Sequence, residues 1–173
     1  MSMSAASPSA ALASPVAFHG TELHALIPHR GDILFASALT VVSRDHFQGT
    51  ACWRVDQAGL AGHFPGAPIV PAVFLVEAAA QIAGAGLVAT RSPDAAGASR
   101  IGVMAGIRRC NFTRPVFPGQ TVHFDLRLGR ATAGFALCSG DLEADGRPAG
   151  ELAFILALAD ADAVLGPSPA KEH

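Results

Sequence analysis

Two ionisable side chains in the middle of the chain could perform acid and base chemistry together. His63 stands in a Gly-His-Phe-Pro-Gly turn, and Glu77 follows fourteen residues later inside an almost wholly apolar stretch. Burial raises the pKa of a carboxyl group and lowers that of an imidazole, so both groups could titrate near neutrality in an apolar cleft. An acid and a base with displaced pKa values are what proton-transfer chemistry requires.

Each of these residues also has a simpler interpretation. Glu77 could lie on the surface of an amphipathic helix, but its neighbours on every side are apolar: Phe74, Val76, Ala80 and Ile82. A buried carboxylate without a partner costs on the order of several kcal/mol, which favours a functional role. His63 could be a turn histidine bonded to the backbone, and its pairing with Glu77 favours a base. Gln81, one turn after Glu77, is expected to orient Glu77 or a water, with plain core hydrogen bonding as the alternative.

The element that must position Glu77 is a helix over Pro71–Thr90, in which nearly every residue is apolar. Its length approaches that of a membrane span. A carboxylate and an amide in its middle, with Gly84 and Gly86 in its second half, instead favour a helix buried inside a soluble protein. Pro71 suits the first helical position, where a missing N–H is harmless.

The rest of the chain is predicted to be mainly strands. In Gln120–Arg130, apolar residues alternate with His123, Asp125 and Arg127, which is the period of a half-buried strand. Similar runs occupy 38–44, 48–55, 101–108, 134–142 and 150–158. One buried helix with several antiparallel strands indicates an α+β fold with the sheet wrapped around the helix. Such a sheet cannot enclose the helix alone, so we expect a dimer.

Composition and charge exclude several classes of protein. The 173 residues indicate one domain, and a net charge of −2 provides no long-range attraction for nucleic acid or an anionic membrane. Eleven of the twelve basic residues are arginine, the exception being Lys171. Three widely spaced cysteines argue against a disulfide framework or a zinc site, and for a reducing compartment. We therefore expect a cytoplasmic protein.

The ends of the chain differ from its middle. Residues 1–17 consist mainly of Ser, Ala and Pro, lack the basic start of a signal peptide, and are predicted to be a disordered leader. Residues 18–165 form the predicted domain, and 166–173 a disordered tail.

Three blocks of the chain stand out together. The central block is GHFPG at 62–66, Pro68, PAV at 71–73 and EAAAQ at 77–81, with LIPHR before it and FTRPVFPGQ after it. In this order they resemble the (3R)-hydroxyacyl-[acyl carrier protein] dehydratases of the hot-dog fold. LIPHR at 26–30 is similar to the family's leading Leu-Pro-His-Arg, and FTRPVFPGQ at 112–120 to its Arg-Pro-Val-x-Pro-Gly block. The resemblance implies a single hot-dog domain and a homodimer with a continuous sheet, from which a higher oligomer could be built.

This resemblance also implies a reaction. His63 of one subunit would remove the α proton of a 3-hydroxyacyl thioester, and protonated Glu77 of the other would donate to the leaving hydroxyl. The products would be a trans-2-enoyl thioester and water. The N–H of Ala72, at the helix N-terminus, would face the thioester oxygen. No metal or organic cofactor is implied, because the thioester itself acidifies the α carbon. The substrate would be carried on the phosphopantetheine of an acyl carrier protein.

Further site residues follow from the same resemblance. Substrate binding is expected at Phe64, Gly66, Ala72 and Gln81. Docking of the acidic carrier protein is expected at Arg108, Arg109 and Arg114, with solubilising strand-end charges as the alternative. Three other histidines have no ligand spacing on one helical face and are expected to be structural or solvated: His19, His24 and His29.

Some residues depart from the family pattern. Ala72 replaces a usual glycine, and the gating tyrosine of the acyl tunnel is absent from GDILF at 31–35. Glu77, rather than the aspartate of a sister group that also isomerises the product, favours dehydration alone. Two pathways stay open for a dehydratase: a specialised polyketide or polyene pathway, and housekeeping fatty acid synthesis. Two other functions are alternatives to a dehydratase: a hot-dog thioesterase, and a non-catalytic partner subunit of a dehydratase complex.

Overall fold

The computed structural model describes residues 11–90, 100–129 and 134–166. In chain order its elements are β1 (Ala11–His19), α1 (Gly20–Leu26), the 3-10 helix η1 (Gly31–Ile33), β2 (Ala36–Ser43), β3 (His46–Cys52), α2 (Ala72–Thr90), β4 (Arg100–Phe112), β5 (Thr121–Leu128), β6 (Phe135–Ala144), β7 (Arg147–Asp160) and α3 (Ala161–Leu165).

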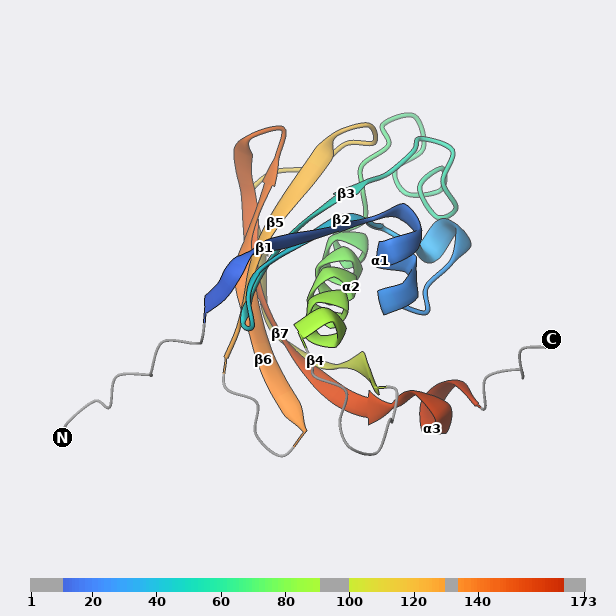
Figure 1. Cartoon of the computed structure of the whole chain (residues 1–173). Helices are drawn as coiled ribbons and strands as arrows, with labels where there is room; N and C mark the ends of the chain where they lie inside the picture. Colours follow the sequence, from blue (N-terminus) through green and yellow to red (C-terminus); the bar gives the residue numbers. More distant parts are fainter. Residues whose placement is uncertain (1–10, 91–99, 130–133, 167–173) are drawn as a thin grey trace.

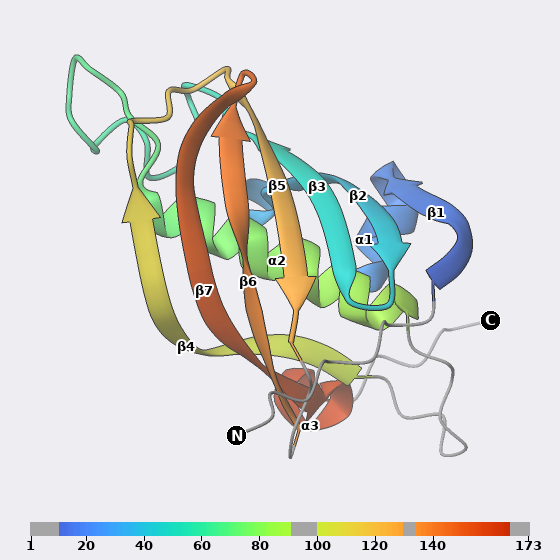
Figure 2. The ribbon, with the colours of Figure 1, turned by 90° about the vertical axis from the view of Figure 1, so that its left-hand side faces the viewer.

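The seven strands form one sheet in the order β1-β2-β3-β5-β6-β7-β4, and every neighbouring pair is antiparallel. The sheet curves around α2, which runs along its concave face (Figures 1 and 2). This arrangement confirms the predicted α+β class and the sheet wrapped around one helix.

Alternation along the strands places the core on the side of α2. In β5, Val122, Phe124 and Leu126 are buried, while His123 and Arg127 are exposed on the outer face. All six predicted strands are present, with ends that differ by up to four residues. The largest difference is in β4, which continues to Phe112 because it pairs with β7 along its whole length.

Helix α2 begins at Ala72, one residue later than predicted. Pro71 stands just before it, and its carbonyl accepts a hydrogen bond from the Phe74 N–H at 2.9 Å. A Cβ atom at Gly86 would overlap the ring of Phe47, so a glycine is needed where the helix meets the sheet. Within the described chain, α2 is the helix long and apolar enough to cross a membrane, and 67% of that stretch is buried inside the protein.

The predicted leader is wrong over its second part. Residues 11–17 belong to β1, which pairs with β2 through Val16 opposite Val41 and Ala17 opposite Thr40. Pairing along a sheet edge uses backbone groups, so a segment without an apolar period can still be ordered there. Residues 1–10, and the predicted tail beyond Gly166, lie outside the described residues.

One side of α2 stays uncovered by the sheet. Val73 is 68% exposed, and Phe74 and Glu77 are only partly buried, although most of the helix after them is buried. The sheet ends at β4, whose Ile107 is also exposed. The expectation that the sheet does not enclose the helix alone is therefore confirmed, while the dimer stays a prediction.

Candidate active site

His63 is held in the loop between β3 and α2. The backbone N–H of His63 donates to the Leu60 carbonyl at 3.0 Å. Two residues that follow, Phe64 and Gly66, have positive φ angles of 58° and 82°. Nδ1 of the ring lies 2.9 Å from the carbonyl oxygen of Ile69. Because a carbonyl can only accept, Nδ1 must carry the hydrogen, which leaves the lone pair on Nε2. The hydrogen bond from Nδ1 to the Ile69 carbonyl thus leaves Nε2 of His63 able to act as a base.

His63 opens onto a hollow of about 420 Å³ at the start of α2. The other lining residues come from the end of the loop, the first turn of the helix, and the end of β4 with the segment after it: Ile69, Val70, Ala72, Leu75, Phe112, Thr113, Arg114, Pro115 and Val116. Most of them are apolar. The hollow is therefore suited to a partly apolar ligand that meets one imidazole.

Glu77 lies on the uncovered side of α2 with two polar partners, one through a hydrogen bond and one at ion-pair distance. Gln81 Nε2 donates to Glu77 Oε1 at 3.0 Å, and His29 Nε2 lies 3.3 Å from the same oxygen. His29 is therefore a partner of the candidate acid and not a solvated side chain, while the other expectation, a structural role, stays a prediction. Sequence reasoning examined His29 only for metal-ligand spacing; its place in the LIPHR block was the available signal.

The pKa of Glu77 is lowered from its usual value. The hydrogen bond from His29 is the largest cause, and the bond from Gln81 and the charge interaction with His29 add to it, while partial burial acts in the opposite direction. The sequence-based expectation of a raised carboxyl pKa is thus wrong for the single chain. Its physical reason is that Glu77 keeps 32% of its side chain exposed and has two polar partners.

Gln81 is buried and fully hydrogen-bonded. Its Oε1 accepts from the backbone N–H groups of Phe35 and Ala36 at 2.9 and 3.1 Å, and its Nε2 donates to the Ile33 carbonyl at 2.7 Å as well as to Glu77. These four bonds use both N–H groups and both lone pairs of the amide. Gln81 therefore makes both of the contacts expected as alternatives: core hydrogen bonds to the backbone and a bond to Glu77. Its place among the substrate-binding residues stays a prediction.

Glu77 opens onto a different hollow from His63. This second hollow, of about 330 Å³, is lined by Pro28, His29, Glu77, Ala80, Gln81, Ile101, Gly102, Val103 and Met104. His63 and Glu77 thus occupy separate hollows within one chain, and the structure does not bring them together. Both hollows border β4, one near its start and one at its end.

Of the remaining predicted site residues, some lie in the loop or the hollow of His63 and others lie on β4. Phe64 is 58% exposed, with its ring edge against His63 at a centroid distance of 4.7 Å, and Gly66 is exposed in the same loop. Ala72 and Arg114 line the hollow of His63. The predicted docking arginines Arg108 and Arg109 are exposed on β4, and Arg109 is paired with Glu151.

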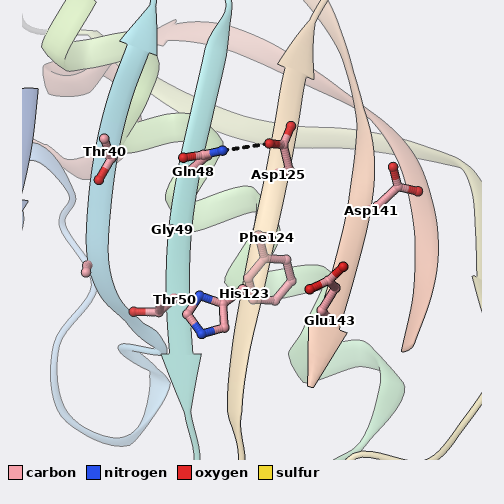
Figure 3. Close-up of a pocket in the computed structure, with 10 residues that line it drawn as sticks. Thr40, Gln48, Gly49, Thr50, His123, Phe124, Asp125, Asp141 and Glu143 are labelled. Carbon is pink, nitrogen blue, oxygen red and sulfur yellow. Dashed lines mark hydrogen bonds between the residues drawn. The ribbon is translucent and has the colours of Figure 1, made fainter. Parts of the chain in front are cut away.

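A third hollow, of about 520 Å³, lies on the outer face of the sheet, away from α2 (Figure 3). Gln48, His123, Asp125, Asp141 and Glu143 line it, and Gln48 donates to Asp125 at 2.8 Å. None of the sequence-predicted site residues lies there. In the described parts of the chain, no group of three or more His, Cys, Asp or Glu side chains is arranged to hold a metal ion.

Comparisons with known proteins identify the family. The model of the FabA-like domain matches residues 44–152. The 3-hydroxyacyl-[acyl-carrier-protein] dehydratase FabZ of Solibacter usitatus is 31% identical over 139 residues, which cover 80% of this chain and 84% of that protein. FabZ of Roseiflexus castenholzii is 34% identical over 139 residues, covering 78% and 94% of the two chains.

Solved structures share the fold. The dehydratase heterocomplex ApeI:P from Xenorhabdus doucetiae superposes with a TM-score of 0.65 at 16% identity, over 83% of this chain and 94% of that one. The fluoroacetyl-CoA-specific thioesterase FlK gives a TM-score of 0.57 at 13% identity, over 69% and 88%. The fold is thus common to dehydratases and thioesterases, whereas the sequence match is to the dehydratases. The chain belongs to the FabA-like domain family.

Proposed function

We propose that this protein is a dehydratase that removes water from a 3-hydroxyacyl thioester carried on an acyl carrier protein. One observation carries the proposal. The side chains of the base, His63, and of the acid, Glu77, are each held by contacts to one polar atom, so that the other polar atom of each can react. His63 is tied through Nδ1 to Ile69, which leaves Nε2, and Glu77 is tied through Oε1, which leaves Oε2. The names of the FabZ relatives support the same reaction.

A second copy of the chain would bring the two hollows together. Strand β4 is an end strand of the sheet and spans 13 residues, so a partner's β4 can pair with it antiparallel. Two-fold pairing about the middle of β4 sets its beginning beside the partner's end. The Ile101–Met104 side of the Glu77 hollow then faces the partner's Phe112 and Thr113, which line the partner's His63 hollow. Each dimer would contain two shared sites, and the exposed apolar side chains of Val73 and Ile107 are available for burial against a partner.

The proposed reaction balances without a co-reactant. Nε2 of the partner's His63 accepts the proton from the α carbon, whose electron pair forms the new double bond as the bond from C3 to its hydroxyl oxygen breaks. Glu77 must be protonated for its part. Once the partner's β4 and the acyl chain exclude water from the hollow, burial would raise the pKa of this carboxyl above its single-chain value. Oε2 then supplies a proton to the hydroxyl oxygen, which leaves as water. The α proton returns to solvent from His63, and Glu77 is reprotonated from solvent. No metal or organic cofactor is needed, because the thioester carbonyl already acidifies the α carbon.

The N-terminus of α2 would stabilise the negative charge that develops on the thioester oxygen. The N–H of Ala72 belongs to the first turn of a 19-residue helix and lies at the hollow of His63. Free N–H groups and the helix dipole favour negative charge at such a position. Removal of one such donor reduces kcat by about 10²- to 10³-fold in enzymes that use this device.

The carrier protein would approach the site from the side of β4. Arg114 lines the His63 hollow and Arg108 is exposed nearby, so both can meet the phosphate of a phosphopantetheine or an acidic protein surface. Arg109 already neutralises Glu151 and is the weaker candidate. Such a protein would act in the cytoplasm, in fatty acid or polyketide chain building.

Mass spectrometry of a 3-hydroxyacyl-carrier thioester incubated with the protein tests the proposal. Loss of one water with the thioester intact is the expected result, and hydration of the enoyl thioester is the reverse. Release of the free acid and the carrier thiol would instead identify a thioesterase. If the folded protein catalyses neither reaction, the chain is a non-catalytic subunit and the proposal fails.

A further inference from the structure

His29 has an arrangement that the proposed acid and base do not explain. Its ring reaches Glu77 through Nε2, at 3.3 Å from Oε1, and its Nδ1 is buried without a hydrogen-bond partner among the described residues. Because Nδ1 has no partner, Nε2 is the ring atom through which His29 acts on another group. The arrangement fits a ring that presents its Nε2–H to Oε1 of Glu77.

The two bonds to Glu77 end on the same oxygen. His29 and Gln81 both contact Oε1, whereas Oε2 takes part in no hydrogen bond or ion pair in the described chain. A carboxyl group held at one oxygen by two donors cannot rotate freely, so the other oxygen keeps one direction. When that oxygen gives up a proton, both donors stabilise the negative charge that forms.

His29 is the only ionisable side chain that lines the described hollow together with Glu77. The part of β4 that faces them, Ile101–Met104, is uncharged. Helix α2 contains no other ionisable residue. In the preceding segment, the Arg30 guanidinium donates to the carbonyls of His24, Ile27 and His29, while Asp32 pairs with Arg54 at 3.5 Å. In the dimer, the partner's His63 hollow would add two ionisable groups, the partner's His63 and the partner's Arg114.

We propose that His29 is a positioning residue for the dehydration. It aims Glu77 Oε2 at the 3-hydroxyl and strengthens Glu77 as an acid by stabilising its conjugate base. This inference rests on the proposed function, because it concerns the acid of that reaction. Glutamine can take over the role, since its Nε2 is separated from Cβ by the same number of bonds as Nε2 of histidine. Leucine cannot, because it fills similar space without a donor.

The first experiment compares kcat and its pH profile for wild type, H29Q and H29L. H29L should lower kcat by about 10- to 100-fold, the effect of losing one hydrogen bond to a charged group, and KM should change less. H29Q should recover most of that loss. H24Q is the matched control, because the structure uses only the backbone carbonyl of His24, and it should retain the wild-type rate.

The pH profile separates a positioning role from a purely structural one. His29 lowers the pKa of Glu77, so its removal raises that pKa, and Glu77 stays protonated to higher pH. The alkaline limb of kcat should therefore move to higher pH in H29L and stay in place in H29Q. Equal loss in both variants with an unmoved limb would overturn the proposal, as would a wild-type rate in H29L.

A measurement without turnover keeps the two proposals distinguishable. The side-chain carboxyl ¹³C signal of Glu77 reports its titration directly, and its midpoint should be higher in H29L than in wild type. If this midpoint shifts while wild type dehydrates nothing, the pairing stands and the proposed reaction fails. If wild type is active and the midpoint does not shift, the role of His29 is wrong and the reaction stands.

Discussion

Replacing Gln81 by leucine should destabilise the fold through a specific set of broken bonds. Gln81 is 1% exposed, and its Oε1 is the acceptor for the N–H groups of Phe35 and Ala36. Leucine fills the space but leaves both N–H groups without that acceptor, and each buried unpaired donor costs about 1–3 kcal/mol. We therefore expect Q81L to lose about 2–6 kcal/mol of unfolding free energy, which moves a urea midpoint down by about 1–3 M at a typical m value.

The assay is urea unfolding at one fixed protein concentration, because association affects apparent stability. T90V is the control on the same helix, since the Thr90 hydroxyl bonds only to carbonyls of its own last turn, those of Gly86 and Leu87. It should lose less than about 1 kcal/mol. A Q81L protein within about 0.5 kcal/mol of wild type would refute the account of this amide, since surface-like substitutions show changes of that size.

Two further predictions concern packing and charge. Alanine at Gly86 would overlap the Phe47 ring and should cost about 1–3 kcal/mol, whereas alanine at Gly84, whose Cβ would lie 3.8 Å from the Gly102 oxygen, should be neutral or stabilising in a thermal melt; equal melting temperatures would contradict this. Burial opposes ionisation of Asp125, but bonds from Gln48 and His46 outweigh it and lower its pKa from 3.8, so its stabilisation is lost as pH falls below that range. The melting temperature of D125N should therefore fall less steeply than that of wild type as the pH is lowered into the acid range. An unchanged slope would count against this pairing.

The fold could be predicted because its signals are local. Period-two alternation identified the strands, and the apolar run before Thr90 identified the central helix. The ends of β4 and the existence of β1 depend on which strand lies alongside, so they have no signature in their own residues. Composition alone therefore placed residues 11–17 in the leader.

The site could be predicted in part for a similar reason. His63 and Glu77 stood out by residue type and by their apolar or turn-rich surroundings. His29 did not, because its contact with Glu77 joins residues 48 positions apart and depends on how the segment before η1 packs against α2. The direction of the Glu77 pKa depends on that contact too, and burial argued from sequence gave the opposite sign.

Subunit complementation tests most directly the claim that the active site is shared between two chains. H63A and E77Q proteins should each be inactive alone. After mixing and subunit exchange, half of the dimers pair one variant of each kind, and each of these has one intact site of two, so activity should return to about a quarter of the wild-type value. A mixture shown to have exchanged subunits that stays inactive would contradict the shared site, because a site built within one chain cannot be restored by a partner.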